Sequence, residues 1–525
     1  MTQKPIVRND ASGEILFRAA EAMSIAGRSA SRRRLLQEAA RRGSDLQTAQ
    51  IWHDRAASRK DFGYIRDLSL PLTSGRPETA LPEWLMSARN EADIHTHYCA
   101  EELRYRLDIL QPGPVSDRSG PLCYVLHMSL PESSSGYAVR SHHLMRAMQK
   151  LGIDPYCVTR LGFPGDTDLP SEAVVQVIDG VSYHRILQPG KRNFRNIRYA
   201  VDAARALVEK LGPLQPRAIM AASNHENAAP ALLAARYLGV PFIYDMRGFW
   251  ELSSLSVNPQ NADTPQFHKL VQMEAELARQ ADLVFTLTDA MRGELRRRGV
   301  GNPAIYLLPN AADPEAFQPR PRNSTLAQKL GIGDSVPVIG YIGSFNLYEG
   351  LDDIVRACVK LHRKGQDFRL LMIGSEPPYL EGRITNEIRQ IAVEGGISDK
   401  LLMPGRVPVN EVEQWYSLVD IVPLPRKDMP VTELVSPLKP LEAMAMEKAV
   451  VVTDLSALKE IVMHQDTGIV VPCNNTDALA DALVDLITNP EVRRALGKRA
   501  RERVVAERNW DAVTRHLRDA LSQVL

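Results

Sequence analysis

The stretch Ser436-Pro-Leu-Lys-Pro-Leu-Glu-Ala-Met-Ala-Met-Glu-Lys-Ala-Val-Val-Val-Thr-Asp454 predicts a short helix followed directly by a buried strand. Pro440 suits the first helical position, because its missing N–H would have no partner there. Glu442 then lies in the first turn, where unpaired backbone N–H groups and the helix dipole favour the ionised carboxylate. Such a carboxylate can accept two hydrogen bonds from a ribose diol, and Lys439 can meet a phosphate. The segment therefore predicts a binding site for a sugar nucleotide.

Strand–helix alternation extends over most of the chain. From about Pro121 to Pro309, short apolar segments alternate with amphipathic ones, and Asn310–Ser324 is typical of a proline-containing linker. A second series starts at Val336–Phe345 and includes the strand Ala449–Thr453. Alternation of this kind predicts βαβ units and parallel sheets. Two such domains place their ligand crevices face to face at the carboxyl ends of the strands, so we expect the active site between them.

The predicted fold class is therefore α/β, with two Rossmann-like, doubly wound parallel-sheet domains facing a cleft and a mainly helical N-terminal extension. We expect the extension to span residues 1–117, the first Rossmann-like domain 118–318 and the second 335–500. Residues 501–525 are expected to form a C-terminal helix that packs back toward the first domain. The extension itself matches no motif.

The composition is that of an ordinary globular enzyme. Hydrophobic residues make up 44% and charged residues 24% of the 525 residues, and the net charge of +1 gives no reason to expect nucleic acid as a partner. The five cysteines are scattered without C-x-x-C spacing, which argues against a disulfide framework or a zinc site. No apolar run approaches the roughly 20 residues of a membrane span, and Met1–Asp10 has no signal-peptide core. We therefore expect a cytoplasmic protein.

Two common nucleotide-binding fingerprints are missing from the sequence. Neither first strand is followed by G-x-G-x-x-G, which disfavours a nicotinamide dehydrogenase, and no G-x-x-x-x-G-K-[ST] indicates a P-loop NTPase. No D-x-D follows a strand end in either half, so we expect neither a divalent metal nor another cofactor.

A basic run lies in the N-terminal extension. The segment Arg28–Arg42 contains a single acid, Glu38, against six arginines, which are Arg28, Arg32, Arg33, Arg34, Arg41 and Arg42. Charge runs are usually solvated helix faces. The alternative is a patch that docks on an anionic membrane or another polyanionic partner, which would place the protein peripherally at the inner face of the membrane.

Several short motifs follow one another in a consistent order over about residues 120–520. The second half holds Ile339-Gly-Tyr-Ile-Gly343, Tyr348-Glu-Gly-Leu-Asp352, Gly405-Arg-Val407, Pro437-Leu-Lys-Pro-Leu-Glu-Ala-Met-Ala445 and Thr467-Gly-Ile-Val-Val-Pro472. The first half holds Ser135-Gly-Tyr-Ala-Val-Arg140, Asn224-His-Glu-Asn227, Tyr244-Asp-Met-Arg-Gly-Phe-Trp-Glu251 and Pro309-Asn-Ala-Ala-Asp313. Together they resemble the retaining glycosyltransferases of family 4, also called group 1, which have the GT-B fold.

The resemblance implies that the first Rossmann-like domain binds the acceptor and the second binds a nucleotide-sugar donor. It further implies retaining transfer from a UDP- or GDP-sugar to a hydroxyl of a carbohydrate or lipid-linked acceptor, in polysaccharide or glycoconjugate synthesis. Retention without an obvious carboxylate nucleophile fits a front-side mechanism, in which the donor phosphate receives the acceptor proton.

On the donor side, Glu442 matches the second glutamate of the family's E-x7-E element, which holds the donor ribose. Leu434 stands where the first glutamate of that element is expected. Glu433 lies one residue earlier and is a candidate contact to the sugar.

The donor diphosphate needs cations or backbone N–H groups as partners. Many members of the family supply basic residues in the loop after the first strand of the second domain, but Glu349 stands in that loop here. We therefore expect Arg426 and Lys439 to form the phosphate clamp and to act in catalysis, with Lys427 beside them. The remaining candidate donor contacts are Gly343, Ser344 and Arg406.

On the acceptor side, His225 resembles the family histidine that faces the transferred sugar, and it follows the carboxyl end of a predicted strand, so we assign it a catalytic role. The small-residue loop Ser133–Gly136 lets the backbone approach a ligand closely. Further acceptor or cleft candidates are Gly136, Arg140, Asp245 and Arg247.

Two other functions fit the same residues. A nucleotide-sugar epimerase of related fold would need no acceptor. A catalytically weak scaffold with a GT-B fold would recruit a partner through its basic extension. The changed phosphate loop and the missing first glutamate are the features that favour the scaffold.

Overall fold

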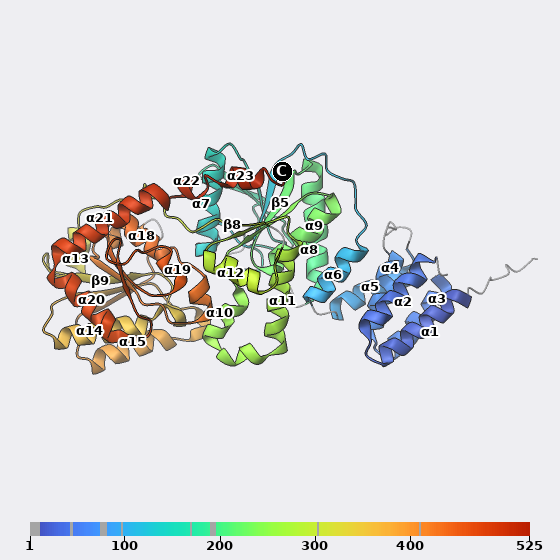
Figure 1. Ribbon diagram of the computed structural model, residues 1–525, viewed down its shortest axis with the longest axis horizontal. Coiled ribbons are helices and arrows are strands. Elements are labelled where there is room, and N and C mark those ends of the chain that lie inside the picture. Colours follow the sequence, from blue (N-terminus) through green and yellow to red (C-terminus); the bar gives the residue numbers. More distant parts are fainter. Residues whose placement is uncertain are drawn as a thin grey trace, which may run out of the picture.

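The computed structural model describes residues 11–42, 46–73, 81–95, 98–167, 171–188, 196–301, 304–408 and 411–525. Two α/β lobes lie side by side, and a group of N-terminal helices extends from the central lobe (Figure 1). This architecture confirms the predicted fold class of two parallel-sheet domains with a helical N-terminal region.

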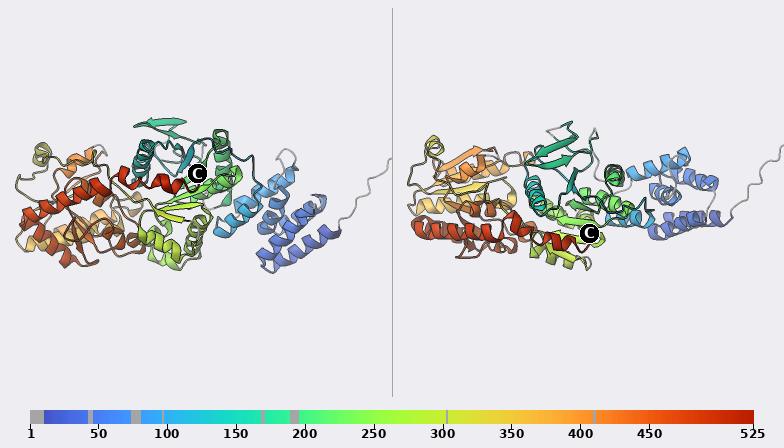
Figure 2. Two further views of the ribbon diagram at one scale, coloured as in Figure 1. Left: turned by 45° about the horizontal axis from the view of Figure 1, so that its top comes forward. Right: turned by 90° about the horizontal axis from the view of Figure 1, so that it is seen from above.

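The first domain is built on an eight-stranded sheet with the order β3-β4-β2-β1-β5-β6-β7-β8. Neighbouring strands are parallel except for β3 and β4, which form an antiparallel hairpin at the outer edge, drawn in teal in Figure 2. The strands are β1 (Leu122–Leu126), β2 (Tyr156–Thr159), β3 (Val175–Ile178), β4 (Val181–His184), β5 (Ala218–Ala222), β6 (Phe242–Met246), β7 (Leu283–Thr286) and β8 (Ala304–Leu307). Every residue of β1, β5, β6 and β7 is buried, as expected for a sheet covered on both faces.

The helices of the first domain connect these strands and cover the sheet. They are α7 (Gly136–Lys150), α8 (Ile197–Leu211), α9 (His225–Leu238), α10 (Trp250–Val257), α11 (Pro265–Gln280) and α12 (Asp289–Arg297). Side-chain caps fix where several of them begin. The Ser135 hydroxyl accepts from the backbone N–H of Ala138 at the start of α7, and Thr288 accepts from Met291 at the start of α12.

The second domain has a six-stranded, all-parallel sheet with the order β11-β10-β9-β12-β13-β14. Its strands are β9 (Val338–Ile342), β10 (Arg369–Ile373), β11 (Leu401–Gly405), β12 (Ile421–Leu424), β13 (Ala449–Thr453) and β14 (Ile469–Val471). Its helices are α13 (Ser324–Lys329), α14 (Leu351–Arg363), α15 (Arg383–Glu394), α16 (Val412–Tyr416), α17 (Pro430–Leu434), α18 (Lys439–Ala445), α19 (Ser456–Lys459), α20 (Thr476–Thr488) and α21 (Pro490–Glu507).

The strand order reverses direction at one point in each sheet. In the first domain this point lies between β1 and β5, and in the second between β9 and β12. Loops that leave adjacent strands in opposite directions open a crevice at their carboxyl ends. The topology therefore selects the segments after β1, β5, β9 and β12 as the positions for a ligand.

The chain end returns to the first domain. After α21 it continues as α22 (Trp510–Val513) and α23 (Leu517–Leu521), and Trp510 and Leu517 join the apolar core beside Leu144 of α7. In Figure 1 these elements are drawn in red across both lobes. The end is thus two short helices against the first domain rather than one continuous helix.

The N-terminal region comprises two parts. Five helices form a bundle around Phe17, Trp52 and Tyr64, namely α1 (Ala11–Ile25), α2 (Ser29–Arg41), α3 (Leu46–Ser58), α4 (Phe62–Thr73) and α5 (Glu83–His95). The sixth, α6 (Ala100–Ile109), packs through Leu103 into the core of the first α/β domain. Beyond it, the backbone N–H of Gly113 donates to the Tyr237 carbonyl at 2.8 Å, so residues 98–117 belong structurally to that domain.

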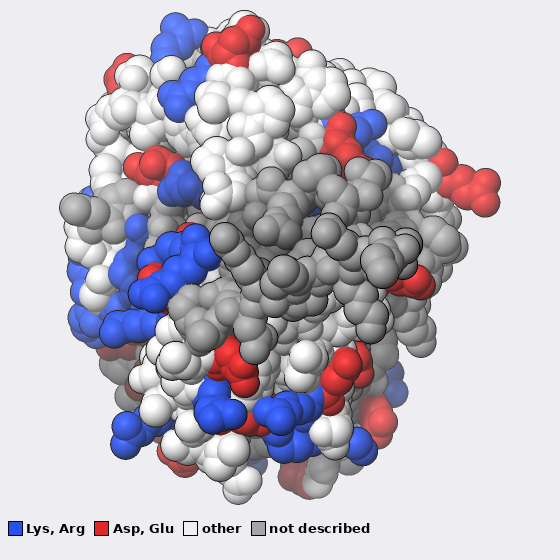
Figure 3. Space-filling model, turned by 90° about the vertical axis from the view of Figure 1, so that its right-hand side faces the viewer, with Lys and Arg blue, Asp and Glu red and all other residues white. Residues whose placement is uncertain are grey.

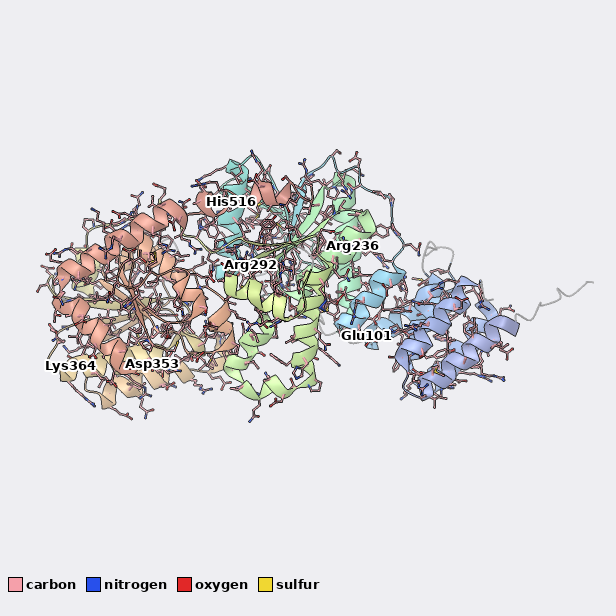
Figure 4. All side chains as sticks on the ribbon, viewed as in Figure 1. Glu101, Arg236, Arg292, Asp353, Lys364 and His516 are labelled. Atoms are coloured by element: carbon pink, nitrogen blue, oxygen red, sulfur yellow. The ribbon has the colours of Figure 1, made fainter. Side chains whose placement is uncertain are left out.

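A buried carboxylate organises the basic run of the extension. Asp67 of α4 is fully buried and pairs with Arg32 Nε at 2.7 Å, Arg33 Nε at 3.3 Å and Arg66 Nη2 at 2.6 Å. Arg32 and Arg33 therefore point into the bundle rather than to solvent. Arg33 also reaches Glu101 of α6, labelled in Figure 4, so the same network ties the bundle to the α/β domain.

Replacing Asp67 should destabilise the packing of α2 against α4. Asp67→Asn leaves three arginines beside a neutral amide, and we expect the local opening free energy of α2 and α4 to fall by about 3 kcal/mol, the cost of uncompensated buried charge. Hydrogen–deuterium exchange of the amides in these two helices measures that change. The control Asp54→Asn, at an exposed α3 carboxylate, should leave the exchange rates unchanged. Equal protection of the α2 and α4 amides from exchange in both variants would contradict the role assigned to Asp67.

Candidate functional site

The two α/β domains meet through the segment between α17 and α18. The Thr288 hydroxyl donates to the Leu434 carbonyl at 2.6 Å, and Asn310 Nδ2 donates to the Ser436 carbonyl at 2.7 Å. Glu460 of the second domain accepts from the first two backbone N–H groups of α12, each at 3.3 Å. These bonds hold the carboxyl edges of the two sheets close together.

The predicted glycine-containing loop of the first domain faces this segment. A Cβ atom built on Gly136 would lie 3.7 Å from Leu438 Cδ1, immediately before α18. Tyr137 follows Gly136, and its hydroxyl accepts from Trp250 Nε1 at 2.9 Å. The start of α7 and the start of α18 are thus brought together across the domain boundary.

On the side of the second domain, a buried carboxylate gathers the two predicted clamp cations. Glu349, which is 2% exposed, accepts from Lys439 Nζ at 2.9 Å, and its carboxylate lies 3.8 Å from Arg426 Nε. Burial alone would raise the pKa of Glu349, but Lys439 and Arg426 outweigh burial and lower that pKa. Lys439 also lies 5.4 Å from the centre of the Tyr341 ring.

The two residues of the predicted clamp and the neighbouring Lys427 differ in their access to a ligand. The Arg426 guanidinium is almost fully buried, lies 5.2 Å from the centre of the Tyr348 ring and donates to the Val435 carbonyl at 2.8 Å. Lys427 turns to α14, where it pairs with Asp352 at 2.9 Å and Asp353 at 2.5 Å, so it does not join the clamp. The Lys439 side chain is 17% exposed, compared with 22% for Lys427 and 5% for Arg426.

Gly343 provides the space that Lys439 occupies. Its φ of +148° lies in a region that favours glycine, and a Cβ there would come within 2.2 Å of Lys439 Cε. Ser344 follows as an exposed residue whose carbonyl accepts from the Tyr341 hydroxyl at 2.8 Å. Arg406 is exposed directly after β11.

Glu442 departs from its expected protonation state. Helix α18 begins at Lys439, one residue before Pro440, and is only seven residues long. Glu442 is half-buried, and within the described residues no hydrogen bond to its carboxylate is found. Burial raises the pKa of Glu442 to about 7, with the charge of Lys439 offsetting only part of the effect. The expected effect of the helix N-terminus on this carboxyl is therefore outweighed by desolvation.

Glu433 has a local structural partner. Its carboxylate accepts from the backbone N–H of Ser456 at 3.1 Å and from the hydroxyl of the same residue. It thus caps the short helix α19, and the side chain is already engaged before any sugar binds.

In the first domain, His225 begins α9 directly after β5. Glu274 of α11 holds it twice, accepting from the backbone N–H at 3.0 Å and lying 3.3 Å from Nδ1. The other oxygen of Glu274 accepts from the Tyr244 hydroxyl at 2.5 Å. Burial would lower the pKa of His225, but the hydrogen bond and the charge of Glu274 outweigh burial and raise it.

The other charged candidates of the first domain are internal. Asp245, Arg247 and Arg140 are 0%, 3% and 2% exposed. Arg247 Nε donates to Asp245 at 2.6 Å, and Arg140 donates to the carbonyls of Leu308 at 2.6 Å and Pro309 at 3.0 Å. Burial lowers the pKa of Arg140 to about 10. These contacts hold α7 against β6 and the chain after β8, a structural role that sequence reasoning did not anticipate.

Sequence reasoning missed His127, which follows β1 at the reversal point of the first sheet. Its ring lies 5.2 Å from that of Trp250, and its buried Nδ1 has no hydrogen-bond partner among the described residues. Burial, together with the positive charge of Arg160, lowers the pKa of His127 to about 3, so the ring is neutral. Its place directly after an apolar strand was the available signal.

Two family models match the chain along most of both α/β domains. Residues 135–311 match the model described as "Glycosyl transferase 4-like domain", and residues 323–503 match "Glycosyl transferases group 1". The chain therefore belongs to the group 1 glycosyltransferases, as the motifs predicted.

Curated relatives agree with this family. An alpha-D-kanosaminyltransferase from Streptomyces kanamyceticus is 26% identical over 51% of this chain and 67% of that protein. A GDP-mannose-dependent alpha-(1-6)-phosphatidylinositol monomannoside mannosyltransferase from Mycobacterium tuberculosis is 28% identical over 42% of this chain. That match spans 56% of the mannosyltransferase, so little more than half of its length is represented here.

Solved structures share the fold. The sucrose-phosphate synthase of Thermosynechococcus elongatus superposes with a TM-score of 0.61 at 20% identity, covering 77% of this chain and 98% of that one. Anabaena Alr3699/HepE in complex with UDP-glucose superposes with a TM-score of 0.59 at 14% identity, covering 77% of this chain and all of that one. These likenesses establish the GT-B fold.

Within the described residues there is neither a membrane-spanning helix nor a cluster of metal-binding side chains. None of the helices in the described ranges combines the length and hydropathy that a bilayer-spanning segment needs. Within the same ranges, no three His, Cys, Asp or Glu side chains form a group that could hold a metal ion.

The raised pKa of Glu442 predicts a pH-dependent stability. Because the folded pKa of about 7 exceeds the unfolded value of 4.5, the folded state binds more protons between these values, and stability falls as pH rises through this window. At pH 8 Glu442→Gln should therefore raise the free energy of unfolding of the second domain by roughly 1–3 kcal/mol, and the gain should vanish near pH 4.5. Denaturant unfolding at several pH values measures it. The exposed neighbour Glu447→Gln is the control, and a gain independent of pH would disprove the assignment.

Proposed function

We propose that this protein transfers a sugar from a UDP- or GDP-sugar to a hydroxyl acceptor with retention of configuration. The observation that carries the proposal is that Gly136, after the reversal point of one sheet, lies against Leu438, whose neighbour Lys439 packs on Gly343, after the reversal point of the other. A relative is GDP-mannose-dependent by name and a structural neighbour was solved with UDP-glucose, so both bases remain in the proposal.

The donor diphosphate is proposed to lie against Lys439. Its side chain is 17% exposed, compared with 5% for Arg426, and the missing side chain of Gly343 leaves the space in which Lys439 lies. Arg426 is proposed to contribute positive charge to the diphosphate site without being exposed in it, since it is buried against Tyr348 and Glu349. Arg406, after β11, and Ser344, after β9, are exposed and supply further donor contacts.

The ribose diol is proposed to bind Glu442. Hydrogen bonds donated to a carboxylate favour its ionised form and lower its pKa. A carboxyl with a pKa of about 7 and no hydrogen bond within the described part of the chain has capacity for such bonds. Glu433 is engaged with Ser456, so a contact with the sugar would require it to exchange partners.

The chemical step is proposed to occur on one face of the sugar. The bond between the anomeric carbon and the diphosphate oxygen breaks with its electron pair going to the diphosphate. The acceptor oxygen bonds to the same carbon, and its proton passes to the leaving phosphate oxygen. Lys439 neutralises the developing negative charge, and His225, held by Glu274, faces the transferred sugar.

The acceptor is proposed to be a carbohydrate or a lipid-linked glycan at the cytoplasmic side of a membrane. The exposed members of the basic run are Arg28, Arg34, Arg41 and Arg42, of which the last two pair with Glu38 at 3.2 and 2.8 Å. On the face formed by the N-terminal helices, Lys and Arg gather at the left and again along the lower part, with Asp and Glu among them (Figure 3). Contact with anionic lipid is proposed for this end, through fewer arginines than the sequence suggested.

The epimerase alternative receives no support from the comparisons, which name transferases. The scaffold alternative is tested together with the transferase, because a scaffold binds no donor.

Lys439→Met tests the proposal. Loss of a charge-assisted contact to phosphate should raise the donor KM or lower kcat by about tenfold. The assay follows release of UDP or GDP from UDP-glucose and GDP-mannose, and thermal shift reports donor binding by the wild type. The control is Lys427→Met, since that ammonium is held by Asp352 and Asp353 on α14 and should contribute little to donor binding. Unchanged kinetics of Lys439→Met would reject the clamp, and absence of any donor binding would reject the transferase.

A further inference from the structure

Tyr98 of the N-terminal region reaches the proposed acceptor site. Tyr98 lies between the helical bundle and α6, is 8% exposed and is part of the apolar core of the first α/β domain. Its ring centre is 5.8 Å from that of His225, and its hydroxyl donates to the His225 carbonyl at 3.4 Å. A residue of the region without family motifs thus touches both the ring and the backbone of the proposed catalytic histidine.

Tyr98 and Glu274 contact His225 from different elements. Glu274 comes from α11, binds the backbone N–H of His225 and lies near Nδ1. Tyr98 binds the carbonyl of the same residue and packs against its ring. The backbone and the imidazole are therefore each held by two groups, which limits the positions that the ring can adopt.

The Tyr98 hydroxyl remains a neutral donor. Burial raises its pKa well above the ordinary value, and the negative charges of Glu274 and Glu226 and the nearby Tyr199 phenol raise it further. The phenol therefore stays protonated at any working pH, and its contact with His225 does not depend on titration of the tyrosine.

The bundle is firmly attached to the segment that carries Tyr98. Helix α6 starts two residues later, and its Glu102 pairs with Arg66 of the bundle at 2.9 Å and with Arg106 at 2.7 Å. On the other side of Tyr98, Asn90 of α5 accepts from Arg198 of α8. Contacts on both sides thus fix Tyr98 relative to the sheet edge.

We propose that Tyr98 is a positioning residue for His225, so that the N-terminal region completes the acceptor side of the site rather than serving only as a separate attachment module. This inference rests on the proposed function, since it assumes that His225 acts on the transferred sugar. The donor nucleotide is assigned to the other domain. Loss of Tyr98 should therefore affect turnover and leave nucleotide affinity intact.

The test compares three variants by hydrolysis of UDP-glucose or GDP-mannose, whichever stabilises the wild type in a thermal shift. Tyr98→Ala should lower kcat by about tenfold, because small displacements of a catalytic group are costly. Tyr98→Phe keeps the ring and loses only a long hydrogen bond, so a loss of about threefold or less is expected. The dissociation constant of UDP or GDP should be unchanged in both.

Tyr105→Phe is the matched control. Tyr105 lies on α6, its ring contacts Arg33 at 4.8 Å, and its buried hydroxyl has no partner among the described residues. Removing that hydroxyl should leave kcat unchanged. If Tyr98→Ala fails to fold by circular dichroism, Tyr98→Leu replaces it, because leucine fills much of the volume without the ring or hydroxyl.

A double-variant cycle separates positioning from a general structural effect. If Tyr98 acts through His225, Tyr98→Ala should cause no further loss of kcat in a His225→Ala background. Three outcomes would each overturn the inference without affecting the proposed transferase activity. They are an equal loss of kcat in the wild-type and His225→Ala backgrounds, an unchanged kcat in Tyr98→Ala alone, and a loss of affinity for UDP or GDP. A wild type that neither binds nor hydrolyses a donor would overturn both proposals.

Discussion

The buried carboxylate of Glu349 is the constraint on which the donor half of the site depends. It follows β9, the strand at the reversal point, and it holds Lys439 of α18 while lying close to Arg426 after β12. Two segments distant in sequence, one after β9 and one between β12 and β13, therefore converge on one anion. Without that anion the two cations would repel each other in a nearly water-free position. Its presence explains how two basic residues can remain close together before any phosphate arrives.

Buried carboxylates paired with arginines also occur at two other places where separate elements of the molecule pack together. Asp245 links the carboxyl end of β6 to Arg247 and to Arg140 of α7. Asp67 links the helices of the N-terminal bundle through three arginines. A buried ion pair adds little net stability compared with apolar packing, but breaking it is costly, so it favours one arrangement over alternatives. In this chain the pairs occur where segments distant in sequence must keep a defined relative position.

The sequence was sufficient to predict the fold, because hydrophobic alternation is a local signal and it repeats in both halves. It also brought out Lys439 from its place beside Pro440 and Gly136 from its small-residue loop, and the family resemblance brought out Gly343. It could not predict that Glu442 has a raised pKa, because desolvation depends on the helices packed around it. Nor could it predict the surroundings of Arg426 and Lys427, because their partners, Tyr348 and Asp352, lie far away in sequence.

The acceptor side of the site shows the same limit of sequence-based prediction more clearly. His225 was selected because it resembles the family histidine and follows a strand. Glu274 and Tyr98, which contact it, come from 49 residues later and 127 residues earlier in the chain. Asp245 and Arg247 also follow a strand, yet their charges are satisfied inside the domain.

Position after a strand therefore selects candidates, and tertiary pairing decides which of them keep capacity for a ligand. Folded proteins pair nearly all buried polar atoms. An atom such as His127 Nδ1, unpaired among the described residues and adjacent to the reversal point, is therefore a better indicator of a binding site than charge alone.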